Sequence, residues 1–205
     1  DLYRFFRISA SGAPLVLPLL GAASAGRGLT GRRAARLLGV AAAFHAFAYV
    51  HNDVCDLELD RTQPLRAAYP LVRGAISPRA AMAVALASAA AALALDAGLG
   101  RAGARARRPL LAAAIGLLAL YNRWGKRCPL PPLTDLAQGL GWAALLGYGA
   151  AAEGRATRMT GLLAAYEVAL IMMVNGVHGA LRDLGNDAAR GARTTAILLG
   201  ARERP

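Results

Sequence analysis

Residues 34–60 read AARLLGVAAAFHAFAYVHNDVCDLELD, an apolar stretch that ends in a dense run of acidic residues. The apolar part is close to the length of about 20 residues that a helix needs to cross a bilayer. In a helix, Asn52, Asp56 and Asp60 follow one another at four-residue spacing and share one face. Asp53 joins Asp56 and Asp60 through the i+3 and i+7 positions. This stretch therefore predicts a membrane helix whose end presents a row of carboxylates.

Apolar stretches of similar length recur along the whole chain. They cover 8–25, 34–51, 79–99, 108–122, 133–152 and 160–181, and a further one begins near Thr194. Hydrophobic residues make up 56% of the chain and charged residues only 18%, which is too apolar for an ordinary soluble domain. We therefore predict an all-α, polytopic transmembrane helix bundle that forms a single domain over residues 1–205. About six helices span the membrane, and a seventh has its start in this chain.

The basic residues lie in short clusters between the apolar stretches. The net charge is +12, and every basic residue except Lys126 is Arg. Such clusters are typical of membrane interfaces and topology signals, and they lack the motif spacing of a nucleic-acid-binding face. We predict the lipid bilayer as a partner, exclude nucleic acid, and expect one set of Arg side chains to be solvated or to contact headgroups: Arg27, Arg32, Arg33, Arg36, Arg101, Arg105, Arg107 and Arg108.

A second acidic motif follows the sixth apolar stretch. It reads Arg182-Asp183-Leu184-Gly185-Asn186-Asp187, with Asp183 and Asp187 again four residues apart. This pattern is weak alone, but six crossings place it on the same side of the membrane as the first motif. The distribution of Lys and Arg slightly favours that side as cytoplasmic.

Carboxylates that are spaced in this way repel one another, and desolvation at the end of an apolar helix adds to the cost. A cation should compensate, and Mg²⁺ prefers hard oxygen ligands together with substrate phosphates. The alternative is a solvated acidic loop. Two acidic sets that face each other across a cavity could hold metal ions around one diphosphate. The predicted metal ligands are Asn52, Asp53, Asp56, Asp60, Asp183 and Asp187.

The two motifs resemble those of the UbiA superfamily of intramembrane prenyltransferases, which carries NDxxDxxxD after its second helix and DxxxD after its sixth. The segments 70–76, 121–127 and 191–200 resemble further family patterns more weakly. Tyr69 departs from the family, which usually has Arg there, and Leu57 stands where some members place a basic residue. The family has nine membrane helices, so the resemblance implies that this chain is truncated at its C-terminus.

The resemblance implies a Mg²⁺-dependent transfer of a prenyl group from a prenyl diphosphate to an aromatic or other electron-rich acceptor, which stays unidentified. It implies catalytic roles for Asp56, Asp60, Asp183 and Asp187. Diphosphate binding would fall to Arg66, Tyr121, Lys126, Arg127 and Arg182, since Arg suits bidentate phosphate contacts.

Several assignments stay open on the sequence alone. His51, Asn175 and His178 either contact substrate or a moving proton, or form hydrogen bonds between helices. Asp135 either caps the start of the fifth helix or interacts with its dipole, or it contacts substrate. A terpene cyclase would use the same metal residues as a transferase. A divalent-cation or proton transporter would also place acids in a membrane bundle, and a truncated product could be inactive.

Overall fold

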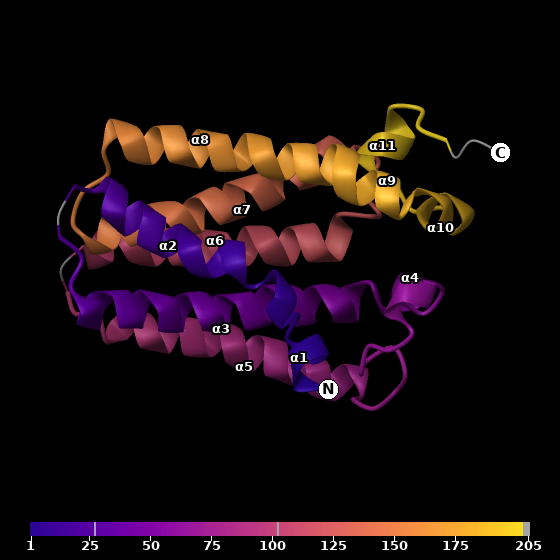
Figure 1. The fold of residues 1–205 in the computed structure, drawn as a ribbon, viewed down its shortest axis with the longest axis horizontal. Helices are drawn as coiled ribbons and strands as arrows, with labels where there is room; N and C mark the ends of the chain where they lie inside the picture. Colours follow the sequence, from indigo (N-terminus) through magenta and orange to yellow (C-terminus); the bar gives the residue numbers. More distant parts are fainter. Residues whose placement is uncertain (27, 102, 203–205) are drawn as a thin grey trace.

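The computed structural model describes residues 1–26, 28–101 and 103–202 as an elongated bundle of helices (Figure 1). Its long helices are α2 (Gly12–Ser24), α3 (Gly31–Cys55), α5 (Pro78–Ala97), α6 (Ala104–Trp124), α7 (Pro131–Ala152) and α8 (Arg158–Met173), and α8 continues through the π-helix η3 (Val174–Gly179) into α9 (Ala180–Arg182). The short ones are α1 (Leu2–Phe5), η1 (Ile8–Ala10), α4 (Leu57–Asp60), η2 (Pro64–Arg66), α10 (Leu184–Ala189) and α11 (Thr195–Leu198). The described residues contain no strand, so the all-α prediction is confirmed.

Each predicted apolar stretch corresponds to one long helix or to a helix with its extension. Within the described residues, three helical segments could cross a membrane by length and composition: Gly31–Cys55, Pro78–Ala97 and Arg158–Arg182. A shorter apolar helix covers Ile8–Ser24. The remaining two long helices are interrupted by polar residues. α6 begins with an Arg-rich turn, and α7 carries Thr134, Asp135 and Gln138.

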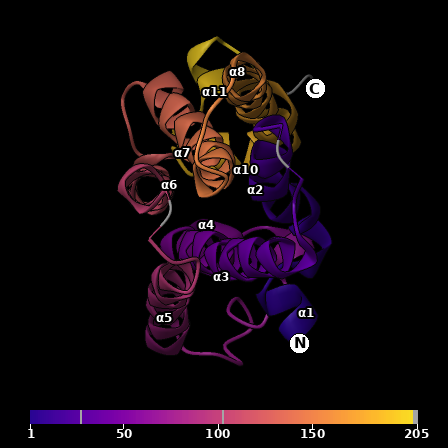
Figure 2. The ribbon, with the colours of Figure 1, turned by 90° about the vertical axis from the view of Figure 1, so that its left-hand side faces the viewer.

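The core of the bundle is organised around α7, which packs against α2, α6 and α8 (Figure 2). In a second set of contacts, α3 packs against α5 and α2. An edge-to-face pair joins the two sets, because the rings of Phe44 on α3 and Trp142 on α7 lie with centroids 5.5 Å apart. Such pairs add about 0.5–1.5 kcal/mol to the free energy gained by burial.

Small residues allow α2 and α7 to cross at backbone distance, as is common for membrane helices. A side chain at Gly149 would overlap the carbonyl oxygen of Pro18, and one at Gly21 would overlap that of Leu146. We expect Gly149→Ala to lower the free energy of unfolding by about 1–3 kcal/mol, because the helices would have to separate. Thermal unfolding in detergent measures the change. Gly116→Ala is the control, since a methyl group there meets open space, and an equal loss in both variants would contradict this account.

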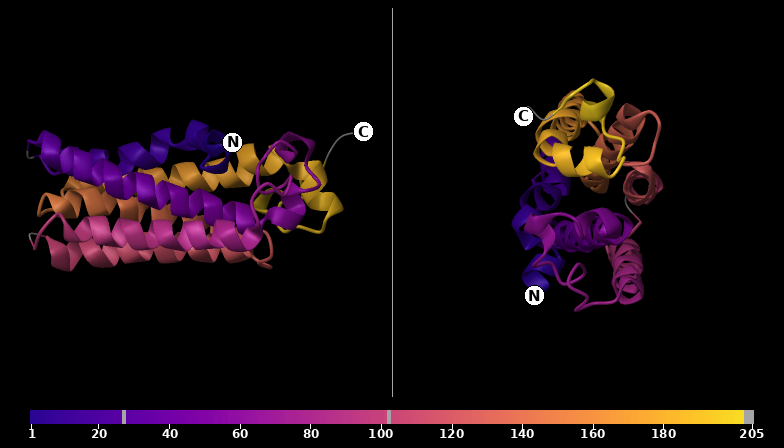
Figure 3. Two further views of the ribbon diagram at one scale, coloured as in Figure 1. Left: turned by 90° about the horizontal axis from the view of Figure 1, so that it is seen from below. Right: turned by 90° about the vertical axis from the view of Figure 1, so that its right-hand side faces the viewer.

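The acidic motifs lie at one end of the bundle. The ends of α3 and α9 carry α4 and α10 there, whereas α2, α5 and α7 end at the opposite side (Figures 1 and 3). The two motifs therefore lie at the same end of the bundle, as the predicted number of helices between them requires.

At the opposite end, one residue of the Arg set that was predicted to be solvated is buried among those that the structure describes; Arg27 of this set lies outside the described residues. Arg107 on α6 has a fully buried side chain, and its Nε donates to Asp96 Oδ1 at 2.6 Å. The prediction that the whole Arg cluster is solvated is wrong for this residue, because the carboxylate of Asp96 compensates its charge within the bundle.

Candidate active site

The first acidic motif lies where α3 breaks and α4 begins. Asp56 ends α3 with φ −96° and ψ 5°, so the motif is two helices joined at one residue. The four-residue spacing survives the break, because the N–H groups of Asp56 and Asp60 still donate to the carbonyls of Asn52 and Asp56, both at 2.9 Å. Asn52, Asp56 and Asp60 consequently line the same cavity.

The second motif repeats this construction. Asp183 ends α9 with φ −101° and ψ 8°, and α10 follows at once. The N–H of Asp187 donates to the carbonyl of Asp183 at 2.9 Å. Asp183 and Asp187 line the cavity that the first motif lines, and Asp187 is 1% exposed.

Cationic side chains are interleaved with these acids. Lys126 Nζ lies 3.2 Å from Asp187 Oδ1, and Arg182 Nη2 lies 2.7 Å from Asp183 Oδ2. Arg66 Nε is 3.8 Å from Asp60 Oδ1. All three cations line the cavity, so its walls offer both metal ligands and anion-binding groups.

Burial and the contacts with cations shift the pKa values of these acids in opposite directions. Burial raises the pKa of Asp56 to about 6, although Lys126 acts against the shift. Burial also raises the pKa of Asp187 despite its contact with Lys126. For Asp183, burial acts upward but the bidentate pairing with Arg182 outweighs it, so the pKa lies below the ordinary value.

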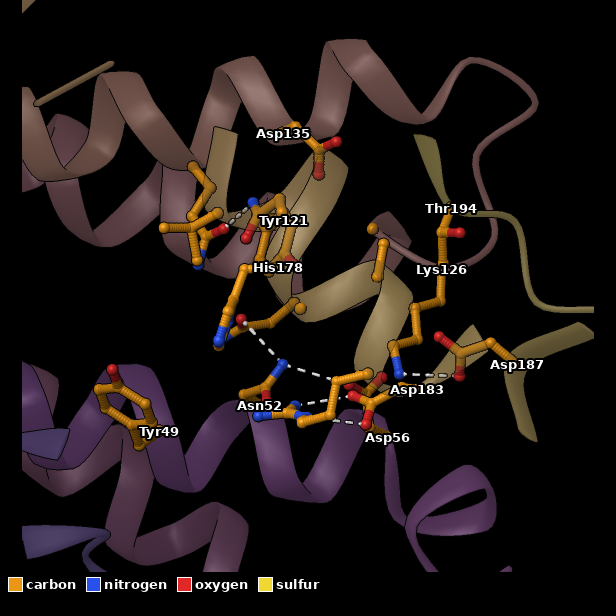
Figure 4. A pocket seen from close by; sticks show the side chains of 18 of the residues that line it. Tyr49, Asn52, Asp56, Tyr121, Lys126, Asp135, His178, Asp183, Asp187 and Thr194 are labelled. Carbon is orange, nitrogen blue, oxygen red and sulfur yellow. Dashed lines mark hydrogen bonds and ion pairs between the residues drawn. The ribbon is translucent and has the colours of Figure 1, made fainter. Parts of the chain in front are cut away.

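The cavity has a volume of about 240 Å³ and reaches from the acidic motifs to residues of α6, α7, η3 and α11. Figure 4 shows Asn52 and Asp56 on one side, Lys126, Asp183 and Asp187 grouped together, and Asp135 on the opposite side. Three further predicted residues line it: Tyr121, Asn175 and His178. The last two lie on η3, and π-helical turns are rare and frequent at functional sites.

Three predicted site residues lie outside this cavity's lining. Asp53 receives two hydrogen bonds from the guanidinium of Arg7. Arg127 donates to the carbonyls of Cys55 and Arg123, both at 3.3 Å. Their roles as metal and diphosphate ligands stay predictions that these contacts do not support.

The third of these residues is His51. Its ring stacks on Phe47 with centroids 5.5 Å apart, and Nδ1 lies 3.1 Å from the amide nitrogen of Asn122. These contacts fit the alternative in which this histidine forms hydrogen bonds between helices.

The sequence reasoning missed Arg7 and Asn122. The backbone of Arg7 adopts φ 47°, and its side chain lines the cavity 3.8 Å from Asp60. Asn122 is 5% exposed and donates to the carbonyl of Ala48 at 2.9 Å. The position of the Asn122 amide at the end of an apolar stretch could have indicated a site residue. Nothing in the sequence indicates the left-handed conformation of Arg7.

Solved structures share this arrangement of helices. The apo structure of a UbiA homolog from Aeropyrum pernix K1 is 24% identical with a TM-score of 0.75, over 94% of this chain and 70% of that chain. A structure of digeranylgeranylglyceryl phosphate synthase is 18% identical with a TM-score of 0.76, over 97% and 68%. A UbiA homolog from Archaeoglobus fulgidus, bound to GPP and Mg²⁺, is 21% identical with a TM-score of 0.75, over 97% and 69%.

No curated protein matches the chain significantly in sequence. A family model does, because residues 14–204 match that of the UbiA prenyltransferase family, and this range contains both acidic motifs. The fold similarity and the matched range agree, and the chain belongs to the UbiA prenyltransferase family.

Proposed function

We propose that this chain transfers a prenyl group from a prenyl diphosphate to an electron-rich acceptor in the membrane, with Mg²⁺ as its cofactor. The observation that carries the proposal is that both acidic motifs line one cavity together with the cationic side chains of Arg7, Arg66, Lys126 and Arg182. A diphosphate is a dense anion, and metal ions together with Lys and Arg are the groups that neutralise it.

The side chains around the cavity fit Mg²⁺ ions that they bind jointly with the substrate. The oxygen donors are Asn52, Asp56, Asp60, Asp183 and Asp187. Among the residues that the structure describes, no three His, Cys, Asp or Glu side chains are close enough to hold an ion by themselves. Mg²⁺ commonly uses one or two carboxylates and completes its shell with phosphate oxygens and water. The donor set therefore fits ions that bind together with the diphosphate.

The chemistry follows from this placement. Bound Mg²⁺ would supply positive charge that stabilises the departing diphosphate. Lys126 and Arg66 hold the diphosphate oxygens, and Arg182 neutralises charge at the more open rim, since its side chain is 52% exposed. The prenyl carbon then faces Trp142 and Tyr121 on the cavity wall, where aromatic faces stabilise positive charge. Catalysis on this account is electrostatic stabilisation together with positioning.

Structures of relatives support the choice of substrate and metal. The homolog from Archaeoglobus fulgidus is described bound to GPP and Mg²⁺ and, separately, to DMAPP and Mg²⁺. We further propose that the acidic motifs face the cytoplasm and that the prenyl chain lies among the apolar helices. A permeability-controlled labelling of single cysteines placed at Glu58 and Arg155 tests this sidedness.

Transferase and cyclase differ in what attacks the prenyl cation. Purified protein incubated with GPP and Mg²⁺, with and without an extract of membrane lipids and quinones, separates them. A prenylated acceptor supports the transferase, whereas a cyclic hydrocarbon formed without acceptor supports a terpene cyclase. A transporter is disfavoured because Asp60, Asp183 and Asp187 each have a cationic neighbour, which a site for bare cations would not need.

Two adjacent basic residues provide a matched test of diphosphate binding. We expect Lys126→Met to raise the dissociation constant of GPP about tenfold or more, because a charge-assisted contact contributes roughly 1.5–3 kcal/mol. Arg127→Met should stay within about twofold, since its guanidinium binds backbone carbonyls outside the cavity. Binding of radiolabelled GPP at saturating Mg²⁺ measures both. An equal loss of GPP affinity in both variants would show that Arg127 contacts the diphosphate and that its side chain moves when GPP binds.

A further inference from the structure

The cavity wall opposite the acidic motifs is lined by polar side chains, and Asp135 is the acid among them. Asp135 and Gln138 from α7, Asn175 from η3 and Thr195 from α11 line it. Figure 4 shows Asp135 across the cavity from Asn52 and Asp56. Side chains from three separate elements thus meet at the end of the cavity that the metal and diphosphate ligands leave free.

Asp135 does not serve as a helix cap. The N-cap position of α7 is Leu130, and no side chain caps it. The carboxylate is instead 7% exposed and accepts a hydrogen bond from the hydroxyl of Thr195. Beside it, the amide of Asn175 donates to Gln138. The capping interpretation of the sequence is therefore wrong. The first turn of α7 contains no acidic residue, so Asp135 also lies beyond the reach of the helix dipole, and the substrate-contact interpretation remains.

Asp135 lacks the cationic neighbour that three acids of the motifs have. Three acids of the motifs, Asp60, Asp183 and Asp187, each have a cation within 4 Å or less, at 3.8, 2.7 and 3.2 Å. No ion pair within the described ranges involves Asp135. A buried carboxylate without a counter-charge favours hydrogen-bond donors and repels anions.

We propose that this wall binds the acceptor and selects one that presents an uncharged hydroxyl group, which Asp135 deprotonates. The inference rests on the proposed prenyl transfer. The C–O bond of the prenyl diphosphate breaks and its electron pair leaves with the diphosphate. A lone pair of the acceptor oxygen forms the new C–O bond, and the hydroxyl proton moves to the carboxylate of Asp135. An acceptor that carries a carboxylate at this end is excluded, because none of the described side chains of this wall, Asp135, Gln138, Asn175 and Thr195, is a cation that would pair with it.

Matched acceptors test the selection. Purified full-length protein is supplied with GPP, Mg²⁺ and one of two pairs of probes: 4-hydroxybenzyl alcohol against 4-hydroxybenzoate, and monoacylglycerol against the corresponding fatty acid. We expect the neutral member of at least one pair to be prenylated at least tenfold faster than its acid. Asp135→Asn should lower kcat for the neutral acceptor about 100-fold, the range of general-base contributions, with GPP binding unchanged within twofold.

Two further variants complete the design. Asp135→Glu, which keeps the carboxylate, should restore more activity than Asp135→Asn. Glu167→Gln is the matched control, because Glu167 is a buried acid on α8 (8% exposed) that does not line the cavity, and its kcat should stay within twofold. Faster transfer to the acids, no transfer to any neutral probe, or an Asp135→Asn variant with wild-type kcat would each overturn the inference while GPP binding persists. Loss of GPP binding by the wild-type protein would instead overturn the proposed function.

Discussion

Replacing Asp56 with Asn should lower kcat for prenyl transfer at least about 100-fold, the range seen when one group that stabilises developing charge is removed. Asp56 lies at the break between α3 and α4 and faces the cavity together with Asp183 and Asp187. Asn keeps the shape of the side chain but removes the negative charge, so Mg²⁺ binds more weakly beside the diphosphate. Release of diphosphate from GPP, measured over a titration of Mg²⁺, should also show a higher Mg²⁺ requirement.

Glu58 gives the matched control for this variant. It belongs to the same acidic stretch but is exposed. It does not line the cavity that both acidic motifs share, although it lines a neighbouring pocket with Asp56, so Glu58→Gln should stay within about twofold of the wild-type rate. Asp53→Asn tests the sequence prediction that Asp53 is a metal ligand. In the structure its carboxylate pairs with Arg7 and does not line the cavity. An Asp56→Asn variant with wild-type activity would remove the first motif from the mechanism. An inactive Glu58→Gln variant would show that the effect comes from net charge and not from position.

The helices of this chain were predictable because their signal is local. Apolar stretches of near-membrane length mark each long helix, and turn residues such as Gly26, Gly100 and Gly154 follow three of them with positive φ. The pairing of the two acidic motifs was also predictable, since the number of crossings alone decides which helix ends share a side. The cationic partners of the acidic residues were not predictable, because contacts between segments far apart in the sequence, such as that of Lys126 with Asp187, depend on packing.

The details of the site depend on geometry that no spacing rule contains. The spacing alone places Asp53 beside Asp56 and Asp60. In the structure, Asp53 instead pairs with Arg7 from the N-terminal segment, which also lies 3.8 Å from Asp60. Arg107 shows the same limit at the other end of the bundle. It belongs to a cluster of Arg residues that resembles a solvated loop, yet it is buried because Asp96 lies on the neighbouring helix. In both cases a partner on another segment of the chain decides where the charged side chain lies.

The ion pair of Asp96 with Arg107 should be a large contributor to the stability of the bundle. Asp96 accepts hydrogen bonds from Arg107, from the hydroxyl of Tyr148 at 3.1 Å and from the exposed Arg108 at 3.2 Å, so it links α5 to α6 and α7. Removing one partner of a buried pair typically costs about 3–5 kcal/mol, because the other charge stays buried. We expect Asp96→Asn to lower the midpoint of thermal unfolding in detergent by roughly 10 °C, at about 2–4 °C per kcal/mol for a chain of this size.

Two comparisons separate the buried charge from other causes. Arg108→Gln removes a cation from the same carboxylate, but this side chain is 58% exposed, so the expected loss is at most about 1 kcal/mol. Combining Asp96→Asn with Arg107→Leu should recover part of the stability, because apolar replacement of a buried pair is often neutral or favourable. GPP binding should persist in the folded fraction of every variant, since the pair lies at the end of the bundle away from the cavity. An Asp96→Asn variant as stable as the wild type would show that Arg107 needs no carboxylate, and the buried pair would then be no part of what holds α5, α6 and α7 together.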